Sequence, residues 1–242
     1  MTAALSLAGV SKRYGGVTAL AGVDLVVPEG SFFGIIGPNG AGKSSLLNAV
    51  TGFLTPDAGS VRIGKLEVQG LPPHAIARQG VARTFQNIRL FAGLSVFENL
   101  QVAAEARERG DGEVAARCDE LLVRLGLDAY RNAAPASLPY GHQRRLEIGR
   151  ALMTAPRILL LDEPAAGMTT PEAQALGAWL RELRDERSLT LVLVEHNMDL
   201  VMAQCDRVHV LDRGASLFEG TPAEVQAEPR VIAAYLGDGS PP

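Results

Sequence analysis

Cysteines and long apolar runs are scarce in this chain of 242 residues. The two cysteines, Cys118 and Cys205, lie far apart in sequence, which excludes a secreted disulfide framework and predicts two reduced thiols. No apolar run approaches the ~20 residues that span a bilayer. Residues 1–10 lack the basic and apolar regions of a signal peptide. The sequence therefore predicts a soluble, cytosolic protein.

An excess of basic charge is also missing. Lysine and arginine total 23 against 27 aspartates and glutamates, which gives a net charge of −4. Proteins that bind nucleic acid usually carry a basic surface, so we expect no nucleic-acid partner. Apolar residues make up 47% of the chain, enough for one substantial core with room for a subdomain.

Apolar patterning predicts two kinds of strand. Nearly continuous apolar runs at residues 32–36, 158–161 and 189–194 are typical of parallel strands covered on both faces. Shorter alternating runs near the N-terminus and a hairpin at residues 61–68 predict a small antiparallel sheet.

Helices are predicted between these strands. Amphipathic spacing indicates helices at residues 43–52 and 113–126. Another is expected to begin at Pro171 with Thr170 as its cap, and residues 221–224 form a capping box. The polar stretch at residues 105–113 is predicted to be an exposed loop.

Residues 37–44 fit the pattern G-x-x-x-x-G-K-[ST] between an apolar strand and an amphipathic helix. The glycines let backbone N–H groups point inward, and the helix start adds partial positive charge, so the loop favours phosphate. Lys43 can reach the β- and γ-phosphates of ATP, and the Ser44 hydroxyl can bind Mg²⁺. The predicted nucleotide-binding residues here are Gly37, Pro38, Asn39, Gly40, Ala41, Gly42, Lys43, Ser44 and Ser45.

Two carboxylates, Asp162 and Glu163, follow the apolar run at residues 158–161. Ligand sites in parallel sheets lie at the carboxyl ends of the strands, where the phosphate loop also emerges. Asp162 is therefore a candidate Mg²⁺ ligand. Glu163 is a candidate base for the water that attacks the γ-phosphate.

Other residues occur in the order and spacing of ATP-binding cassette (ABC) ATPases, which the chain resembles from about residue 5 to residue 237. Gln86 resembles the Q-loop glutamine, His196 the switch histidine and Tyr14 the aromatic that stacks on adenine. The resemblance implies catalytic roles for Gln86 and His196, with Gln86 also on Mg²⁺.

Residues 138–148 occupy the place of the ABC signature motif and are called the signature segment below. The resemblance implies nucleotide contacts from Gly141 and His142. The fold it implies is α/β: a P-loop NTPase core with a parallel sheet, an N-terminal antiparallel β subdomain and an inserted helical subdomain. We expect one ATP-binding domain over residues 1–242, with the helical subdomain at residues 87–150.

Four stretches resemble one subfamily, the ATP-binding subunit of high-affinity branched-chain amino acid importers. They are residues 83–91, 140–148, 195–198 and 229–237. This resemblance implies that two cassettes sandwich ATP head to tail and that transmembrane permease subunits recruit a solute-binding protein. It also implies a second, different ABC ATPase subunit, with a homodimer as the alternative. Through the permease subunits, this chain is expected at the inner face of the cell membrane.

The chain departs from the wider ABC pattern at two places. The signature serine is Pro139, which has neither a hydroxyl nor a backbone N–H, and the first signature glycine is Tyr140. The D-loop acid is replaced by Thr169. We expect slower hydrolysis of the nucleotide that this signature segment completes, unless the subfamily geometry compensates.

Three other functions stay open at this stage. A related cassette could serve a urea or amide importer, and a soluble ABC ATPase could act on DNA or ribosomes. Such soluble ABC ATPases normally carry tandem cassettes, a coiled coil, zinc-binding cysteines or a basic face, none of which is visible in this sequence. A nucleotide-binding regulator without turnover is disfavoured by Glu163.

Overall fold

The computed structural model describes residues 2–105 and 111–236. The strands are β1 (Ala3–Tyr14), β2 (Val17–Pro28), β3 (Phe32–Ile36), β4 (Ala58–Ile63), β5 (Leu66–Glu67), β6 (Val81–Arg83), β7 (Ile158–Asp162), β8 (Thr190–Val194), β9 (Arg207–Asp212) and β10 (Ala215–Gly220). The helices are α1 (Lys43–Val50), α2 (Pro73–Arg78), α3 (Val96–Glu105), α4 (Asp111–Leu125), α5 (Tyr140–Met153), α6 (Thr170–Arg187), α7 (Met198–Gln204), α8 (Pro222–Ala227) and α9 (Pro229–Leu236). Two 3₁₀ turns, η1 (Asp128–Tyr130) and η2 (Pro135–Ser137), precede α5.

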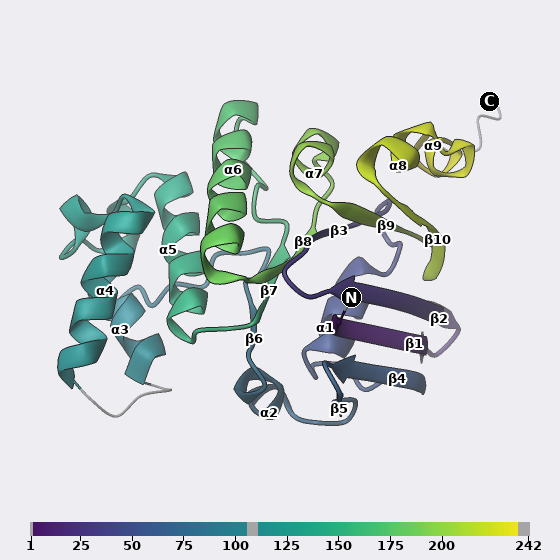
Figure 1. The fold of residues 1–242 in the computed structure, drawn as a ribbon, viewed down its shortest axis with the longest axis horizontal. Coiled ribbons are helices and arrows are strands. Elements are labelled where there is room, and N and C mark those ends of the chain that lie inside the picture. The colour runs from purple at the N-terminus through teal and green to yellow at the C-terminus, as the bar shows by residue number, and fades with distance from the viewer. Residues whose placement is uncertain (1, 106–110, 237–242) are drawn as a thin grey trace.

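The central sheet has six strands in the order β10-β9-β3-β8-β7-β6. Strands β9, β3, β8, β7 and β6 run parallel, and β10 pairs antiparallel with β9. Every residue of β3, β7 and β8 is buried, which confirms the three predicted strands. Helices α6 and α7 lie over one face of this sheet (Figure 1).

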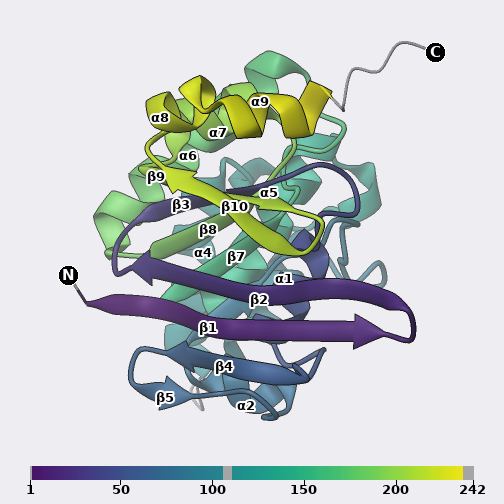
Figure 2. The same cartoon turned by 90° about the vertical axis from the view of Figure 1, so that its right-hand side faces the viewer.

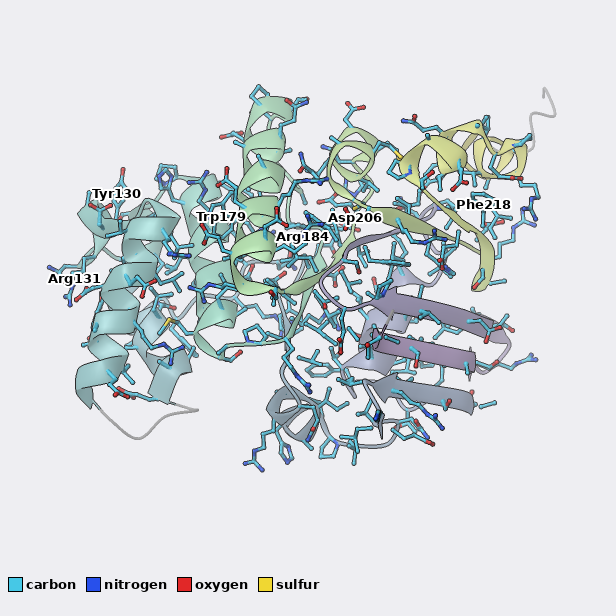
Figure 3. The ribbon with its side chains drawn as sticks, viewed as in Figure 1. Tyr130, Arg131, Trp179, Arg184, Asp206 and Phe218 are labelled. Carbon is cyan, nitrogen blue, oxygen red and sulfur yellow. The ribbon has the colours of Figure 1, made fainter. Side chains whose placement is uncertain are left out.

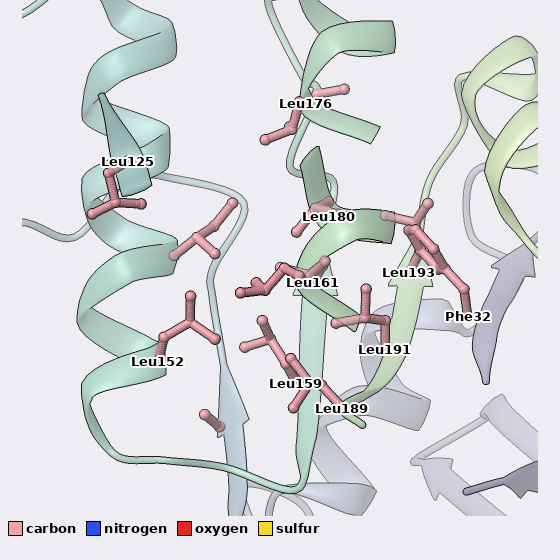
Figure 4. Close-up of a cluster of buried hydrophobic side chains, with 14 of the residues drawn as sticks. Phe32, Leu125, Leu152, Leu159, Leu161, Leu176, Leu180, Leu189, Leu191 and Leu193 are labelled. Carbon is pink, nitrogen blue, oxygen red and sulfur yellow. The ribbon is translucent and has the colours of Figure 1, made fainter. Parts of the chain in front are cut away.

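The buried strands serve two cores because successive side chains point to opposite faces. Phe32 on β3 packs with Leu159, Leu161, Leu191 and Leu193 in the core beneath the helices (Figure 4). Their sequence neighbours belong to a second core on the other face, which includes Phe33, Leu160 and Val192. Two covered faces explain why these strands are apolar without alternation.

A second sheet, in the order β2-β1-β4-β5, covers that other face with α1 between the layers. Its strands pair antiparallel, and β4 and β5 form the hairpin predicted at residues 61–68 (Figure 2). A tight turn at Gly15 and Gly16 joins β1 to β2. The predicted antiparallel sheet is therefore confirmed.

Helices α3, α4 and α5 lie together at one end of the molecule (Figure 1). The predicted helix at residues 113–126 corresponds to α4. The predicted loop at residues 105–113 is wrong at both ends, because α3 extends to Glu105 and α4 begins at Asp111; residues 106–110 lie outside the described residues. The polar residues Glu105 and Asp111 belong to helix ends. The boundaries 87–150 for a helical subdomain stay a prediction.

The cap of α6 also differs from the prediction by one residue. Thr169 is the N-cap, and its backbone N–H donates to the Glu172 carboxylate at 2.8 Å, forming a capping box. The side chain of Glu172 reaches back three residues to Thr169, which places the boundary before Thr170. The capping box predicted at residues 221–224 is confirmed at the start of α8.

An ion pair anchors α6 to the central sheet. Arg184 Nη1 on α6 lies 2.6 Å from Asp206 Oδ2, which also accepts a hydrogen bond from the Phe32 N–H at 2.8 Å (Figure 3). The helix end is thereby fixed to the first residue of β3. No helix in the described ranges has the length and apolar character that crossing a bilayer requires.

Candidate functional site

The phosphate loop connects β3 to α1, and two of its glycines lie too close to other backbone to carry a side chain. Gly37 and Gly42 have φ of 156° and 104°. A Cβ on Gly37 would lie 2.2 Å from the Leu211 carbonyl oxygen, and one on Gly42 would lie 2.6 Å from that of Ala19. Both contacts are with backbone, so a side chain would displace the loop.

Lys43 places a cation inside this loop. Its Nζ donates to the carbonyl oxygens of Gly37 at 2.6 Å and Pro38 at 3.2 Å, and the residue is 7% exposed. Burial lowers the pKa of the ammonium, whereas the nearby carboxylates of Glu163 and Asp162 raise it. The buried positive charge therefore faces the two carboxylates that end β7.

Asp162 is held by a buried arginine that the sequence reasoning did not single out. Arg83 at the end of β6 donates from Nη2 to Asp162 Oδ2 at 2.8 Å. Its Nη1 donates to Asn48 Oδ1 at 2.7 Å and Thr51 Oγ1 at 3.2 Å on or next to α1. Arg83 thus links three elements around the phosphate loop and occupies Oδ2 of Asp162. Its position three residues before Gln86 was the available signal.

The predicted catalytic residues meet at one carboxylate. Gln86 Nε2 donates to Glu163 Oε2 at 2.7 Å, and His196 Nδ1 lies 3.7 Å from the same oxygen. Glu163 follows β7, His196 follows β8 and Gln86 follows β6, so three neighbouring parallel strands bring these side chains together. Gln86 and His196 are exposed and Glu163 is partly buried, which leaves the cluster open to solvent.

Glu163 has an unusual backbone conformation, with φ of 47°. Its N–H donates to the Val194 carbonyl at 2.8 Å, and its own carbonyl accepts from the Ala166 N–H at 3.2 Å. A non-glycine residue held in this region costs about 1–3 kcal/mol and persists where surrounding bonds fix it, typically at functional sites. The backbone of β8 therefore helps aim the Glu163 side chain.

The start of α5 carries the signature segment and offers little side-chain chemistry. Pro139 is the N-cap and provides no side-chain hydrogen bond. The His142 ring packs edge-on against Tyr130, with centroids 5.4 Å apart. Space is open around Gly141, where an added Cβ would meet no described atom within 4 Å. The helix N-terminus is thus the feature here that favours an anion.

A buried pair connects α5 to the loop that carries Gln86. Arg144 is fully buried, and its guanidinium donates to the carbonyl oxygens of Phe85 and Gln86, each at 2.8 Å, and to Glu147 at 2.7 Å. Glu147 in turn accepts from the Arg89 N–H at 3.1 Å. The signature helix and the Gln86 loop are therefore tied together through the backbone.

Two other predicted residues lie apart from this cluster. Tyr14 is exposed at the end of β1, where Lys12 Nζ is 5.7 Å from its ring centroid, and it stays a prediction as the adenine-stacking residue. Thr169, at the place of the missing D-loop acid, is the N-cap of α6. The structure thus gives this threonine a local role.

The oxygen atoms near the phosphate loop suit Mg²⁺, which prefers carboxylate, hydroxyl and phosphate oxygens. Ser44 is exposed at the start of α1, and Asp162 has Oδ1 besides the oxygen bonded to Arg83. Gln86 donates from Nε2, which leaves its amide oxygen for a metal. No cluster of three or more histidine, cysteine or acidic residues that could hold a metal occurs in the part of the chain that the structure describes.

The sequence of this chain matches known families and proteins. The ABC transporter family matches residues 20–166, and the family described as branched-chain amino acid ATP-binding cassette transporter matches residues 217–240. The chain is 43% identical to the high-affinity branched-chain amino acid transport ATP-binding protein BraF of Pseudomonas aeruginosa, over 97% of this chain and 98% of BraF. It is 41% identical to LivG of Escherichia coli, with the same coverage.

Solved structures agree. The crystal structure of an ATP-binding cassette of an ABC transporter in its ADP conformation has a TM-score of 0.88 and 30% identity, covering 98% of this chain and 99% of that one. A dimeric cassette bound to ADP and phosphate after hydrolysis has a TM-score of 0.81 and 28% identity, covering 90% and 98%. The predicted fold class is confirmed. This chain, with its phosphate loop at residues 37–44 and its two carboxylates at the end of β7, is therefore an ATPase that belongs to the ABC transporter family of ATP-binding proteins.

Proposed function

We propose that this chain is the ATP-hydrolysing subunit that powers an importer of branched-chain amino acids. Two observations favour this cargo over urea or amides: the names of the relatives that are more than 40% identical over almost the full length, and the family match at residues 217–240. The meeting of Gln86, Glu163 and His196 supports hydrolysis rather than mere nucleotide binding.

The phosphate loop would bind the phosphates of ATP. Lys43 supplies a buried cation, and inward backbone N–H groups with the α1 N-terminus supply partial positive charge. Ser44, Asp162 and Gln86 would hold Mg²⁺, which neutralises charge on the β- and γ-phosphate oxygens when bound. Tyr14 would stack on the adenine, and Gly141 with His142 would contact the nucleotide of a second cassette.

Hydrolysis would be carried by Glu163. Its carboxylate takes a proton from the attacking water, and the Gln86 amide holds the carboxylate in place through the 2.7 Å hydrogen bond. His196, whose Nδ1 lies 3.7 Å from the same oxygen, would donate toward the γ-phosphate as charge develops there. Each residue acts from the end of a different strand.

Transmembrane permease subunits would dock beside Gln86. A groove of about 490 Å³ lies at the β6 edge of the central sheet, beside helices α2, α3 and α5. Its lining includes the aromatic rings of Phe53, Phe85 and Phe91 as well as the charged residues Arg83, Glu147 and Arg150. Phe53 and Phe91 are 59% and 48% exposed. Apolar helices from a permease would cover them, placing the chain at the inner face of the cell membrane and linking it through the permease to a solute-binding protein.

The second cassette of the sandwich would be a different chain. Pro139 cannot donate to a γ-phosphate, so a sandwich of two identical chains would have two weakened sites. A partner cassette with a serine in its signature would complete the site built around Glu163 of this chain.

Uptake by cells tests this function. Deletion of the chain should abolish high-affinity uptake of radiolabelled leucine, isoleucine and valine, and the wild-type gene but not Lys43→Ala should restore it. Loss of urea or amide uptake with intact leucine uptake would instead support the alternative cargo.

A co-purification tests the docking groove. Phe91→Asp, which places a charge in the groove, should show less bound permease than wild type.

A further inference from the structure

A buried carboxylate that none of the proposed steps uses lies beside the catalytic cluster. Glu195 is fully buried directly after β8, although glutamate is rarely buried completely without partners. Burial raises the pKa of this carboxyl, while three backbone N–H groups and His196 act in the opposite direction. Its partners explain why it is tolerated.

The two oxygens of Glu195 bind two different loops. Oε1 accepts from the Ala165 N–H at 2.8 Å, in the turn that follows Glu163. Oε2 accepts from the N–H groups of His196 at 3.1 Å and Asn197 at 3.3 Å, in the loop that follows β8. One side chain therefore joins the loop of the candidate base to the loop of the candidate switch histidine.

Two features give this link a consequence for chemistry. Glu163 has a strained backbone, so the turn at residues 163–166 depends on its hydrogen bonds. The separation between His196 Nδ1 and Glu163 Oε2, 3.7 Å, is set by how the two loops lie against each other. A shift of one loop would change the distance between the two groups.

We propose that Glu195 is a positioning residue for hydrolysis: it holds the loops of Glu163 and His196 in the relative position that catalysis needs. This inference rests on the proposed roles of Glu163 and His196. It assigns Glu195 no contact with the nucleotide, so ATP binding should not depend on it.

Glu195→Gln separates this role from a general contribution to folding. Glutamine keeps the size of the side chain but replaces one acceptor oxygen with an NH₂ donor, so either the Ala165 bond or the His196 and Asn197 bonds are lost. Glu195→Asp keeps the charge but is one methylene too short to reach both loops. Glu219→Gln is the matched control, because Glu219 is a partly buried carboxylate on β10 with Arg207 and His209 as partners.

The measurement is steady-state hydrolysis of radiolabelled ATP with Mg²⁺ by the full chain, alone and with its partner cassette. For Glu195→Gln and Glu195→Asp we expect kcat to fall about 10–100-fold, as misplaced catalytic groups do, with KM for ATP within about twofold of wild type. Glu219→Gln should keep the wild-type kcat. Hydrogen exchange should quicken at residues 163–168 or 195–198 in Glu195→Gln but not in the phosphate loop.

Several outcomes would overturn the proposal. One is a folded Glu195→Gln variant whose kcat is within about twofold of wild type. Another is a rise of KM for ATP that matches the loss of kcat, and a third is an equal loss of kcat in Glu219→Gln. The last is failure of both Glu195 variants to fold. A wild-type chain that hydrolyses no ATP contradicts the proposed function itself. A wild type that does, beside an unaffected Glu195→Gln, contradicts only the positioning role.

Discussion

The ends of β6, β7 and β8 differ sharply from the start of α5. At the strand ends, charged and polar side chains are fixed by one another: Arg83 holds Asp162, and Gln86 and His196 lie at Glu163. At the start of α5, the N-cap is a proline without a side-chain bond. Under the proposed function, the chain would supply the side chains that act on its own nucleotide, whereas to the nucleotide of a partner it would offer mainly the N-terminus of α5.

Large effects are expected at the phosphate loop, whose Lys43 lies close to the two carboxylates that end β7. Lys43→Ala removes the buried cation that the phosphate loop encloses. Loss of one such preorganised group costs about 10²–10³-fold in rate, and we expect ATP binding to weaken as well. Radiolabelled ATP hydrolysis and nucleotide binding measure both. Lys65→Ala, an exposed lysine in the turn between β4 and β5, is the control and should match wild type.

Asp162→Asn should affect the same region differently. The amide oxygen can still accept from Arg83, but the charge that favours Mg²⁺ is lost. We expect ATP affinity in Mg²⁺ to fall toward the affinity in a chelator, while wild type binds more tightly with the metal. Titrations with and without Mg²⁺ measure this. A variant that keeps the full metal-dependent gain would remove Asp162 from the metal site.

The start of α5 should show smaller effects. Because Pro139 lacks a donor, we expect the purified chain to be a weak ATPase and mostly monomeric with ATP and Mg²⁺. Pro139→Ser should raise turnover of the purified chain by a few fold, and light scattering should show more dimer. Robust turnover by a stable wild-type homodimer would contradict the contrast between the two regions.

The smallest expected effect is on the reactivity of two cysteine thiols buried in the core that both regions share. Burial raises the pKa of Cys118 to about 11 and that of Cys205 to about 12. A thiol dye at pH 8 should therefore label the native chain slowly and the unfolded chain at both sites. The pKa values are raised on folding, so their contribution to stability is present below about pH 9 and is lost as the pH rises toward 12. Rapid native labelling would place the thiols nearer the surface.

Local patterns predicted much of this molecule. The phosphate loop and the carboxylates after β7 follow contiguous signals, and the buried strands follow from apolar runs. Arg83 and Glu195 were not predicted as site residues because their partners are distant in sequence: Asp162 is 79 residues from Arg83, and Ala165 is 30 from Glu195. The Thr170 cap was wrong because Thr169 and Thr170 are adjacent, and only the bond to Glu172 distinguishes them.

Glu163→Gln tests the central claim most directly, namely that Glu163 is the base of a site built by this chain. The variant keeps the size of the side chain, and Lys43, Ser44 and Asp162 remain to bind ATP and Mg²⁺. Binding and size analysis with ATP and Mg²⁺, in the presence of the partner cassette, should show ATP bound at wild-type affinity. Hydrolysis should be about 10²–10⁴-fold slower, with an accumulated ATP-bound sandwich. Loss of ATP binding, or hydrolysis at the wild-type rate, would contradict the account.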